Sequence, residues 1–211
     1  MNPIRILLAD DHAVVRQGFR AMLAQQPDIS IVGEAGNGRE VLALAEKTKP
    51  DLIVMDVAMP ELNGIEATRR LTANMPGLRI LALSMHKDSV YVREMLKAGA
   101  KGYLLKDSGE SDLLDAVRTL ARGGEYISPA VQEALISASR ASGTSALDQL
   151  TSREREVLQL IAEGKTNKDV AVVLKISPFT VDAHRGRIME KLKVHNVNEL
   201  VRFAVRHGLI D

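Results

Sequence analysis

The chain has 211 residues, a formal net charge of +1, no cysteine, no tryptophan and only 3% aromatic residues. The lack of cysteine excludes disulfides, thiolate nucleophiles and zinc–thiolate sites, and the scarcity of aromatic side chains argues against a stacking platform for single-stranded nucleic acid. The N-terminus does not have the pattern of a signal peptide, and no apolar stretch is long enough to span a bilayer. We therefore expect a cytoplasmic protein that has no membrane partner.

Charge is distributed unevenly along the chain. Residues 1–125 carry 16 Lys and Arg against 17 Asp and Glu, whereas residues 147–211 carry 11 against 9. The second segment is weakly basic, which is a modest indication that it has an anionic partner.

Short apolar runs alternate with helical patterns through the first 122 residues. Strands are predicted at 4–9, 29–35, 52–55, 78–83 and 103–105, and helices at 12–25, 38–47, 65–73, 89–97 and 111–122. This alternation predicts an α/β, doubly wound parallel sheet of five strands, flavodoxin-like, with strand order 2-1-3-4-5. In that order the ligand crevice lies outside the carboxyl ends of strands one and three.

Polar residues stand at the ends of the strands that border this crevice. The stretch DLIVMDVAMPELNG (51–64) is a buried strand that ends at Asp56 and is closed by Met-Pro and Asn-Gly turns. Strands one, four and five end at Asp10 and Asp11, at Ser84 and at Lys106, whereas strand two, at the sheet edge, ends at Glu34-Ala35. Each residue alone has an ordinary explanation as a polar strand end, but together they predict a single site.

The residue types at this site indicate phosphoryl chemistry. Three carboxylates in one crevice repel each other unless a proton or a cation neutralises them. Oxygen ligands without histidine or cysteine favour Mg²⁺. Lys106 and Ser84 would then stabilise the oxygens of a transferred phosphoryl group, and an ionised aspartate such as Asp56 can act as the nucleophile.

The second segment is predicted to be entirely helical. A helix that begins at Ser128-Pro129 fades near Arg140, and ASGTSA (141–146) has the composition of a flexible linker. Capping boxes predict a helix from Thr151 through Ala162 and a short helix from Thr166 to about Leu174. Further helices are expected from Ser177 to Leu192 and from Asn196 to Arg206, and this order is typical of a small all-α four-helix domain with a helix-turn-helix. We predict a phospho-acceptor domain at 1–122, a linker helix and flexible linker at 123–147, and a DNA-binding domain at 148–211.

Both segments resemble known families. LLADDH, IVMDVAMPELNG, LALSMH and GYLLKD match the acid pair, phospho-acceptor, hydroxyl and lysine motifs of response-regulator receiver domains. LTSREREVLQLIAEGKTNKDVA and ISPFTVDAHRGRIMEKLKV resemble the LuxR-type DNA-binding domain. In this order the two motif sets are similar to those of the NarL/FixJ subfamily of two-component response regulators. Asp107 follows Lys106 where receivers often have proline, and Asp182 and Gly186 stand where relatives often have basic residues.

The resemblance implies a set of roles. It assigns Asp56 as the phospho-acceptor, Asp10, Asp11, Asp56 and the carbonyl of Ala58 as Mg²⁺ ligands, Lys106 as the phosphoryl partner, and Ser84 with Tyr103 as a switch pair. It implies a regulator that is not an enzyme beyond its own phosphoryl transfer and dephosphorylation. The implied partners are a sensor histidine kinase, a double-stranded DNA operator, RNA polymerase as a further candidate, and a second copy of the chain after phosphorylation.

The helical pattern of 177–192 predicts which residues face DNA. Val181, Ile188 and Leu192, with His184 between them, form the core side, and the opposite side is available to a major groove. Arg187 could contact a phosphate or pair with guanine, and Asp182 could accept a hydrogen bond from cytosine or be a first-turn acid favoured by the helix dipole. The predicted DNA-binding residues are Lys165, Thr166, Lys168, Thr180, Asp182, Ala183, Arg185, Gly186, Arg187 and Lys191. The helix at 196–206 is the candidate dimer surface.

Two other functions compete with this interpretation. A phosphatase with an aspartate nucleophile would normally carry a second acid close after it and a cap domain, and neither is visible. A regulator that senses a small molecule would need an apolar, aromatic-lined cavity, and the chain has few aromatic residues. A flavin site is disfavoured because no glycine-rich phosphate loop follows the first strand.

Overall fold

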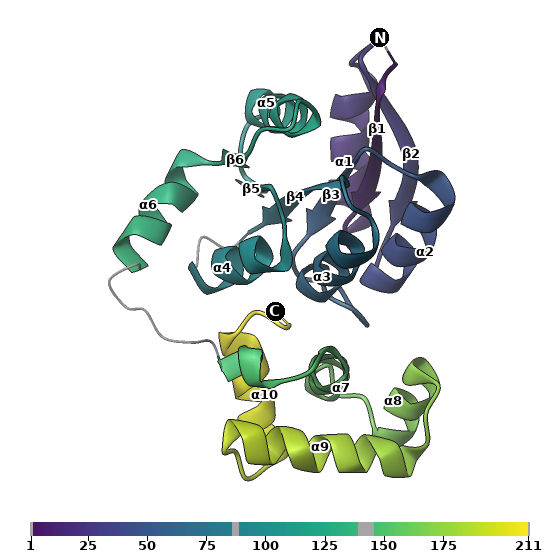
Figure 1. Ribbon diagram of the computed structural model, residues 1–211, viewed down its shortest axis with the longest axis vertical. Coiled ribbons are helices and arrows are strands. Elements are labelled where there is room, and N and C mark those ends of the chain that lie inside the picture. The colour runs from purple at the N-terminus through teal and green to yellow at the C-terminus, as the bar shows by residue number, and fades with distance from the viewer. Residues whose placement is uncertain (1, 86–88, 139–145, 211) are drawn as a thin grey trace. The chain divides into compact units, whose positions relative to one another are not determined.

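A computed structural model describes residues 2–85, 89–138 and 146–210 (Figure 1). Contacts divide the chain into two units, Met1–Ala141 and Ser142–Asp211. In the described residues no helix is both long enough and apolar enough to cross a membrane. The predicted linker residues 141–145 lie outside the described ranges.

The first unit alternates strands and helices, as predicted. Its elements are β1 (Ile4–Ala9), α1 (Ala13–Ala24), β2 (Ile29–Ala35), α2 (Gly38–Thr48), β3 (Leu52–Asp56), α3 (Gly64–Asn74), β4 (Arg79–Ser84), α4 (Ser89–Ala98), β5 (Gly102–Leu105), α5 (Glu110–Ala121), β6 (Tyr126–Ile127) and α6 (Pro129–Ala138). All strand pairs are parallel. The strand order is β2-β1-β3-β4-β5-β6, which confirms the predicted doubly wound order and places the first and third strands side by side.

The sheet has six strands rather than the predicted five. Tyr126 and Ile127 pair with Gly102 and Tyr103 of β5, and the N–H of Ser128 donates to the carbonyl of Tyr103 at 3.0 Å. A Cβ on Gly102 would lie 3.1 Å from the carbonyl oxygen of Tyr126, so the bare glycine lets the two strands approach. β6 is too short to show an alternating pattern in the sequence. Because β6 pairs with β5, β5 is an inner strand of the sheet.

Helices cover both faces of the sheet, and alternate strand residues point to opposite faces. Leu7 and Ile53 belong to a core cluster with residues of α2, α3 and α4, whereas Ile6 and Leu52 belong to a cluster with residues of α1 and α5. The strands β3, β4 and β5 are buried on both faces, which explains their continuous apolar runs. The helix α6, which the sequence placed in the linker, packs against α4 and β5 and belongs to the first unit.

The described residues of the second unit form helices joined by turns and contain no strand, as predicted. After a short 3-10 turn, η1 (Ala146–Gln149), it contains α7 (Ser152–Ala162), α8 (Asn167–Leu174), α9 (Pro178–Leu192) and α10 (Val197–Arg206). Thr151 with Glu154 and Thr166 with Asp169 form the two predicted capping boxes. A core cluster that includes Val157, Val170 and Leu200 joins α7, α8 and α10, and the α8–α9 pair forms the predicted helix-turn-helix.

Candidate phosphoryl site and nucleic-acid interface

The strand register brings the predicted site residues to one end of the sheet. Ala9 pairs with Met55, Asp56 pairs with Leu83, and Ser84 pairs with Leu105. Asp10, at the end of β1, is therefore the neighbour of Asp56. The N–H of Lys106 donates to the carbonyl of Ser84 at 2.9 Å, so the hydroxyl-bearing residue and the lysine are held next to each other by backbone contacts.

The loop after β3 closes tightly against Asp56. A Cβ on Gly64 would lie 1.9 Å from the carbonyl oxygen of Asp56, and the N–H of Gly64 donates to the carbonyl of Val57 at 2.9 Å. The side chain of Asn63 then caps α3 by accepting from the N–H of Glu66. The Asn-Gly pair that the sequence marked as a turn therefore fixes the backbone that carries Asp56.

A lysine bridges two buried carboxylates at the site. Nζ of Lys106 lies 2.7 Å from Oδ2 of Asp10 and 2.7 Å from Oδ2 of Asp56, and the three side chains are only 8%, 3% and 5% exposed. Nζ of Lys106 donates a hydrogen bond to Oδ2 of Asp56. The contact with Asp10 is an ion pair, because its Oδ2 has no hydrogen-bond partner. Asp56, Asp10 and Lys106 are thus in mutual contact, as the strand ends predicted.

Burial sets the ionisation of this cluster. Burial raises the pKa of Asp56 to about 7, against the attraction of Lys106 and with a further contribution from the negative charges of Asp10 and Asp11. Burial disfavours the charged form of Lys106, but the attraction of Asp56 and Asp10 outweighs it and raises the pKa of that lysine. Without a further cation, one ammonium group cannot neutralise all the carboxylates that face it.

The acid cluster has the ligands that a metal ion would need. Single ligand atoms of Asp10, Asp11, His12 and Asp56 all lie within 4.8 Å of one another, and Oδ2 of Asp10 has Nζ of Lys106 at 2.7 Å as a charged neighbour. The close approach of three carboxylates fits a further cation. A ring nitrogen of His12, which directly follows the acid pair, also lies within this group. Nδ1 of His12 lies 2.8 Å from Oδ1 of Asp11 and the side chain is 64% exposed.

The remaining predicted residues of this unit are placed as follows. Ser84 is buried at the end of β4, and Ala58 is partly exposed in the loop two residues after Asp56. Tyr103 is fully buried in the cluster that includes Tyr91 and Val131. Because β6 pairs with β5, Tyr103 does not lie on an edge strand.

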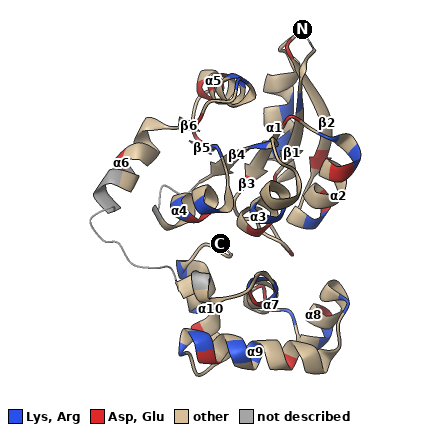
Figure 2. Cartoon of the chain, in the orientation of Figure 1, with Lys and Arg blue, Asp and Glu red and all other residues tan. Residues whose placement is uncertain are grey.

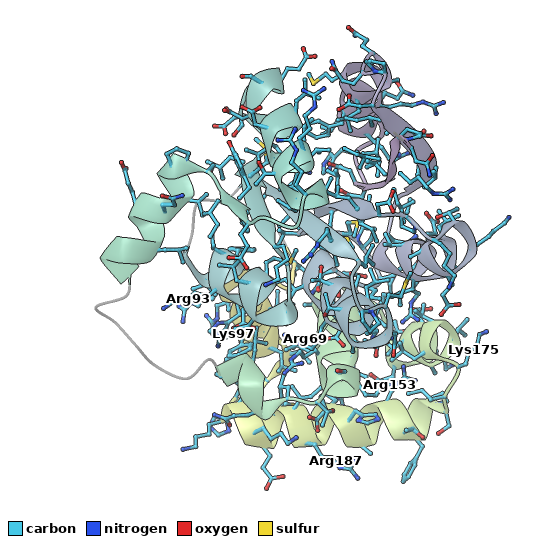
Figure 3. The ribbon with its side chains drawn as sticks, turned by 45° about the horizontal axis from the view of Figure 1, so that its top comes forward. Arg69, Arg93, Lys97, Arg153, Lys175 and Arg187 are labelled. Carbon is cyan, nitrogen blue, oxygen red and sulfur yellow. The ribbon has the colours of Figure 1, made fainter. Side chains whose placement is uncertain are left out.

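The second unit presents one side of α9 to solvent, as its helical pattern predicted. Val181 and Ile188 are fully buried, and Leu192 packs against the same core. The residues of the opposite side are all exposed, namely Phe179, Asp182, Ala183, Gly186, Arg187 and Glu190. In Figure 3 the labelled Arg187 points away from the rest of its unit. Lys and Arg, blue in Figure 2, recur along α9.

Several of the predicted DNA-binding residues have partners within the unit. Nζ of Lys191 lies 2.7 Å from Oε2 of Glu154, whose side chain is only 4% exposed. The hydrogen bonds from Lys191 and from the N–H of Thr151 outweigh burial and lower the pKa of Glu154. Lys191 therefore links α9 to α7, and this contact competes with the phosphate contact expected from the sequence. The sequence showed Glu154 only as a capping residue, because its second partner is 37 residues away.

Asp182 is also engaged. Its Oδ1 accepts from Nη2 of Arg185 at 2.6 Å and from Nδ2 of Asn167 at 3.3 Å. The first turn of α9 contains no acid, so the interpretation of Asp182 as a first-turn acid is wrong. The exposed Lys168 and Arg187 stand on α8 and α9, and Lys165 is partly exposed just before α8. The side chain of Thr166 caps α8, and the hydroxyl of Thr180 lies 2.8 Å from that of Ser177.

Comparisons with known proteins agree with this geometry. The model of the response regulator receiver domain matches residues 6–118, and that of the bacterial regulatory proteins of the LuxR family matches residues 148–204. The uncharacterized transcriptional regulatory protein YxjL of Bacillus subtilis (strain 168) is 41% identical over 100% of this chain and 99% of its own length. The transcriptional regulatory protein LiaR of the same organism is 40% identical over 99% of this chain and 100% of its own.

Among solved structures, RcsB from Salmonella enterica serovar Typhimurium, bound to a promoter in the presence of the phosphomimetic BeF3⁻, is similar with a TM-score of 0.62. It is 27% identical, and the match covers 96% of this chain and 98% of RcsB. Together, the buried acid–lysine cluster, the helix-turn-helix and these matches show that the chain belongs to the family of two-component response regulators that join a receiver domain to a LuxR-type DNA-binding domain.

Proposed function

We propose that this chain is a transcriptional regulator in which phosphorylation of Asp56 controls dimerisation and binding to DNA. The observation that carries the proposal is the contact of Nζ of Lys106 with Oδ2 of both Asp10 and Asp56 at 2.7 Å, in a buried acid cluster. Such a site needs positive charge to ionise fully, and it offers a buried nucleophile beside a fixed cation.

The phosphoryl donor would be the phosphohistidine of a sensor kinase. An oxygen of Asp56 attacks the phosphorus, the P–N bond breaks, and the histidine leaves with the bonding electron pair. Lys106 offsets the charge on the phosphoryl oxygens, and the hydroxyl of Ser84 donates to one of them. In this sequence of events the phosphoryl group is transferred to the chain itself. The chain would therefore catalyse only its own phosphoryl transfer and dephosphorylation.

Mg²⁺ is the cation that best fits the oxygen donors of this cluster. Asp10, Asp11, Asp56 and the carbonyl of Ala58 would hold it, directly or through water. When bound, Mg²⁺ supplies positive charge that favours the ionised form of Asp56 and neutralises charge on phosphoryl oxygens. His12, whose side chain is 64% exposed, borders this cluster, with its Nδ1 2.8 Å from Oδ1 of Asp11 and 3.6 Å from Oδ1 of Asp10.

The phosphorylated state would be detected by the pair Ser84 and Tyr103. A hydroxyl drawn toward the phosphoryl group shifts an equilibrium between two arrangements around β5. Tyr103 packs beside residues of α4 and α6, so a change at β4 and β5 would reach both helices.

The second unit would bind a DNA operator as a dimer. Lys165, Lys168, Arg185 and Arg187 supply phosphate contacts, with Thr166 and Thr180 near the starts of α8 and α9. Few cations face the groove, so a single unit should bind weakly. Leu200 and Ala204 of α10 are buried in the unit's own core, whereas Val197 and Val205 are 42% and 43% exposed and remain for a dimer contact. RNA polymerase is a further candidate partner of the bound regulator.

The test is to measure DNA binding and molar mass of the full chain with and without BeF3⁻ and Mg²⁺. A rise in both DNA affinity and dimer fraction is expected for the wild type, and neither should change in Asp56→Ala. Unchanged DNA binding in the wild type, or an equal response in Asp56→Ala, would overturn the proposal.

A further inference from the structure

Phe179 is exposed at the start of the helix that is proposed to enter DNA. It is the second residue of α9 and is 84% exposed. On a helix of 3.6 residues per turn it lies opposite the buried Val181 and Ile188. Single exposed apolar residues are common, so exposure alone has little meaning. The place is informative, however, because the first turns of a recognition helix are the part that reaches base edges.

The rest of the same side is small and is not explained by packing. Ala183 and Gly186 follow Phe179 at helical spacing and are exposed. A Cβ on Gly186 would meet nothing within 4 Å. Glycine weakens a helix interior relative to alanine, so the domain's own fold gives no reason for the missing side chain. The small residues Ala183 and Gly186 let the backbone of α9 approach a partner closely, while the ring of Phe179 projects toward that partner.

The acidic groups on this side are poorly suited to base recognition. Asp182 already accepts from Arg185 and Asn167, and Glu190 repels phosphates. Arg187 on the same side is assigned above to a phosphate, and apolar contact is the means of direct recognition that the start of α9 offers. In the major groove the C5-methyl group of thymine is the apolar feature that distinguishes one base pair from another.

We propose that Phe179 recognises the C5-methyl group of a thymine in the major groove and so sets one position of the operator in each half-site. The inference rests on the DNA-binding function proposed above and specifies its sequence preference. The ring would cover the methyl group, and the small side chains of Ala183 and Gly186 would let α9 lie deep enough for that contact.

The test combines one protein change with one DNA change. The preferred operator is first obtained by binding-site selection with the wild-type chain, BeF3⁻ and Mg²⁺. Each thymine is then replaced by deoxyuridine, which removes only the methyl group. At one position per half-site this change should weaken wild-type binding about fourfold. This is the ratio expected when the burial of one methyl group is lost from the complex. Phe179→Ala should bind more weakly and show no further loss at that position.

Two controls distinguish a failure of the proposed thymine contact from a failure of the proposed DNA-binding function. Lys168→Ala should lose affinity for every DNA and yet keep the methyl dependence, and the thermal unfolding of Phe179→Ala should match that of the wild type because the side chain is exposed. If Phe179→Ala loses as much affinity on methyl removal as the wild type, or binds the operator as tightly, the inference is overturned while DNA binding stands. If the wild type selects no sequence, the proposed function itself fails.

Discussion

Gly64 lies against the backbone of Asp56 so closely that a Cβ at position 64 would come within 1.9 Å of the carbonyl oxygen of Asp56. Asn63 supplies the cap of α3, and the N–H of Gly64 donates to Val57. A residue with no reactive group therefore determines where the nucleophile stands. The geometry of the phosphoryl site depends on this contact as much as on its charged side chains.

Gly64→Ala should disturb both the fold and the site. The added methyl group meets backbone rather than a flexible side chain, so we expect a loss of about 1–3 kcal/mol in the free energy of unfolding and slower phosphorylation. Gly18→Ala is the matched control, because a Cβ at this exposed position of α1 would meet nothing within 4 Å and should stabilise the chain by up to about 1 kcal/mol. Urea unfolding of the two variants measures the difference, and equal midpoints would contradict the close contact.

The Glu154–Lys191 pair should make the second unit sensitive to acid. The pKa of Glu154 is lowered from 4.5 in the folded state, so its contribution to stability is complete above about pH 4.5 and is lost as pH falls through the lowered folded value. Glu154→Gln should remove this part of the pH dependence. Lys191→Ala should cost about 1–3 kcal/mol at neutral pH, because it leaves a buried carboxylate with one donor fewer.

The measurement for this pair is the free energy of unfolding of the second unit between pH 3 and pH 7, followed by NMR signals of residues such as Val157. An unchanged acid limb in Glu154→Gln would show that other groups control the transition.

The sequence was sufficient for the order of helices and strands in this fold and for the contact among Asp10, Asp56 and Lys106. Buried parallel strands have a characteristic apolar run, and the carboxyl ends of such strands must meet at one edge. The pairing of β6 with β5 could not be foreseen because two residues carry no period. The bond between Lys191 and Glu154 could not be foreseen either, since it depends on how α9 packs against α7. The same holds for His12, whose place depends on its rotamer.

Lys168→Ala should weaken binding to all DNA sequences alike and reduce the slope of log affinity against log salt by about 1 per domain, since one phosphate contact is lost. Lys191→Ala is the contrasting variant. Its charge is held by Glu154, so the salt slope should stay as in the wild type even if stability falls. Fluorescence anisotropy over a range of salt concentrations gives both slopes. An equal reduction in both variants would mean that Lys191 leaves its partner to bind a phosphate.

Tyr103 should report the phosphorylated state only if the proposed switch exists. Because the ring is fully buried, Tyr103→Ala should cost about 3–5 kcal/mol in stability, as for other large-to-small core changes. Tyr103→Phe keeps the packing and is the better variant for signalling. The ring signals of Tyr103 should shift in NMR spectra when BeF3⁻ and Mg²⁺ are added. Identical spectra in both states would remove Tyr103 from the switch.

The most direct measurement of the central claim is the intact mass of the full chain after incubation with a small acyl phosphate. With Mg²⁺, the wild type should gain one phosphoryl group per chain. Asp56→Ala should gain none, and a chelator should prevent the gain in the wild type. One phosphoryl group on Asp56→Ala, or a gain that proceeds equally well under chelation, would contradict the assignment of Asp56 as the phospho-acceptor of a metal-dependent site.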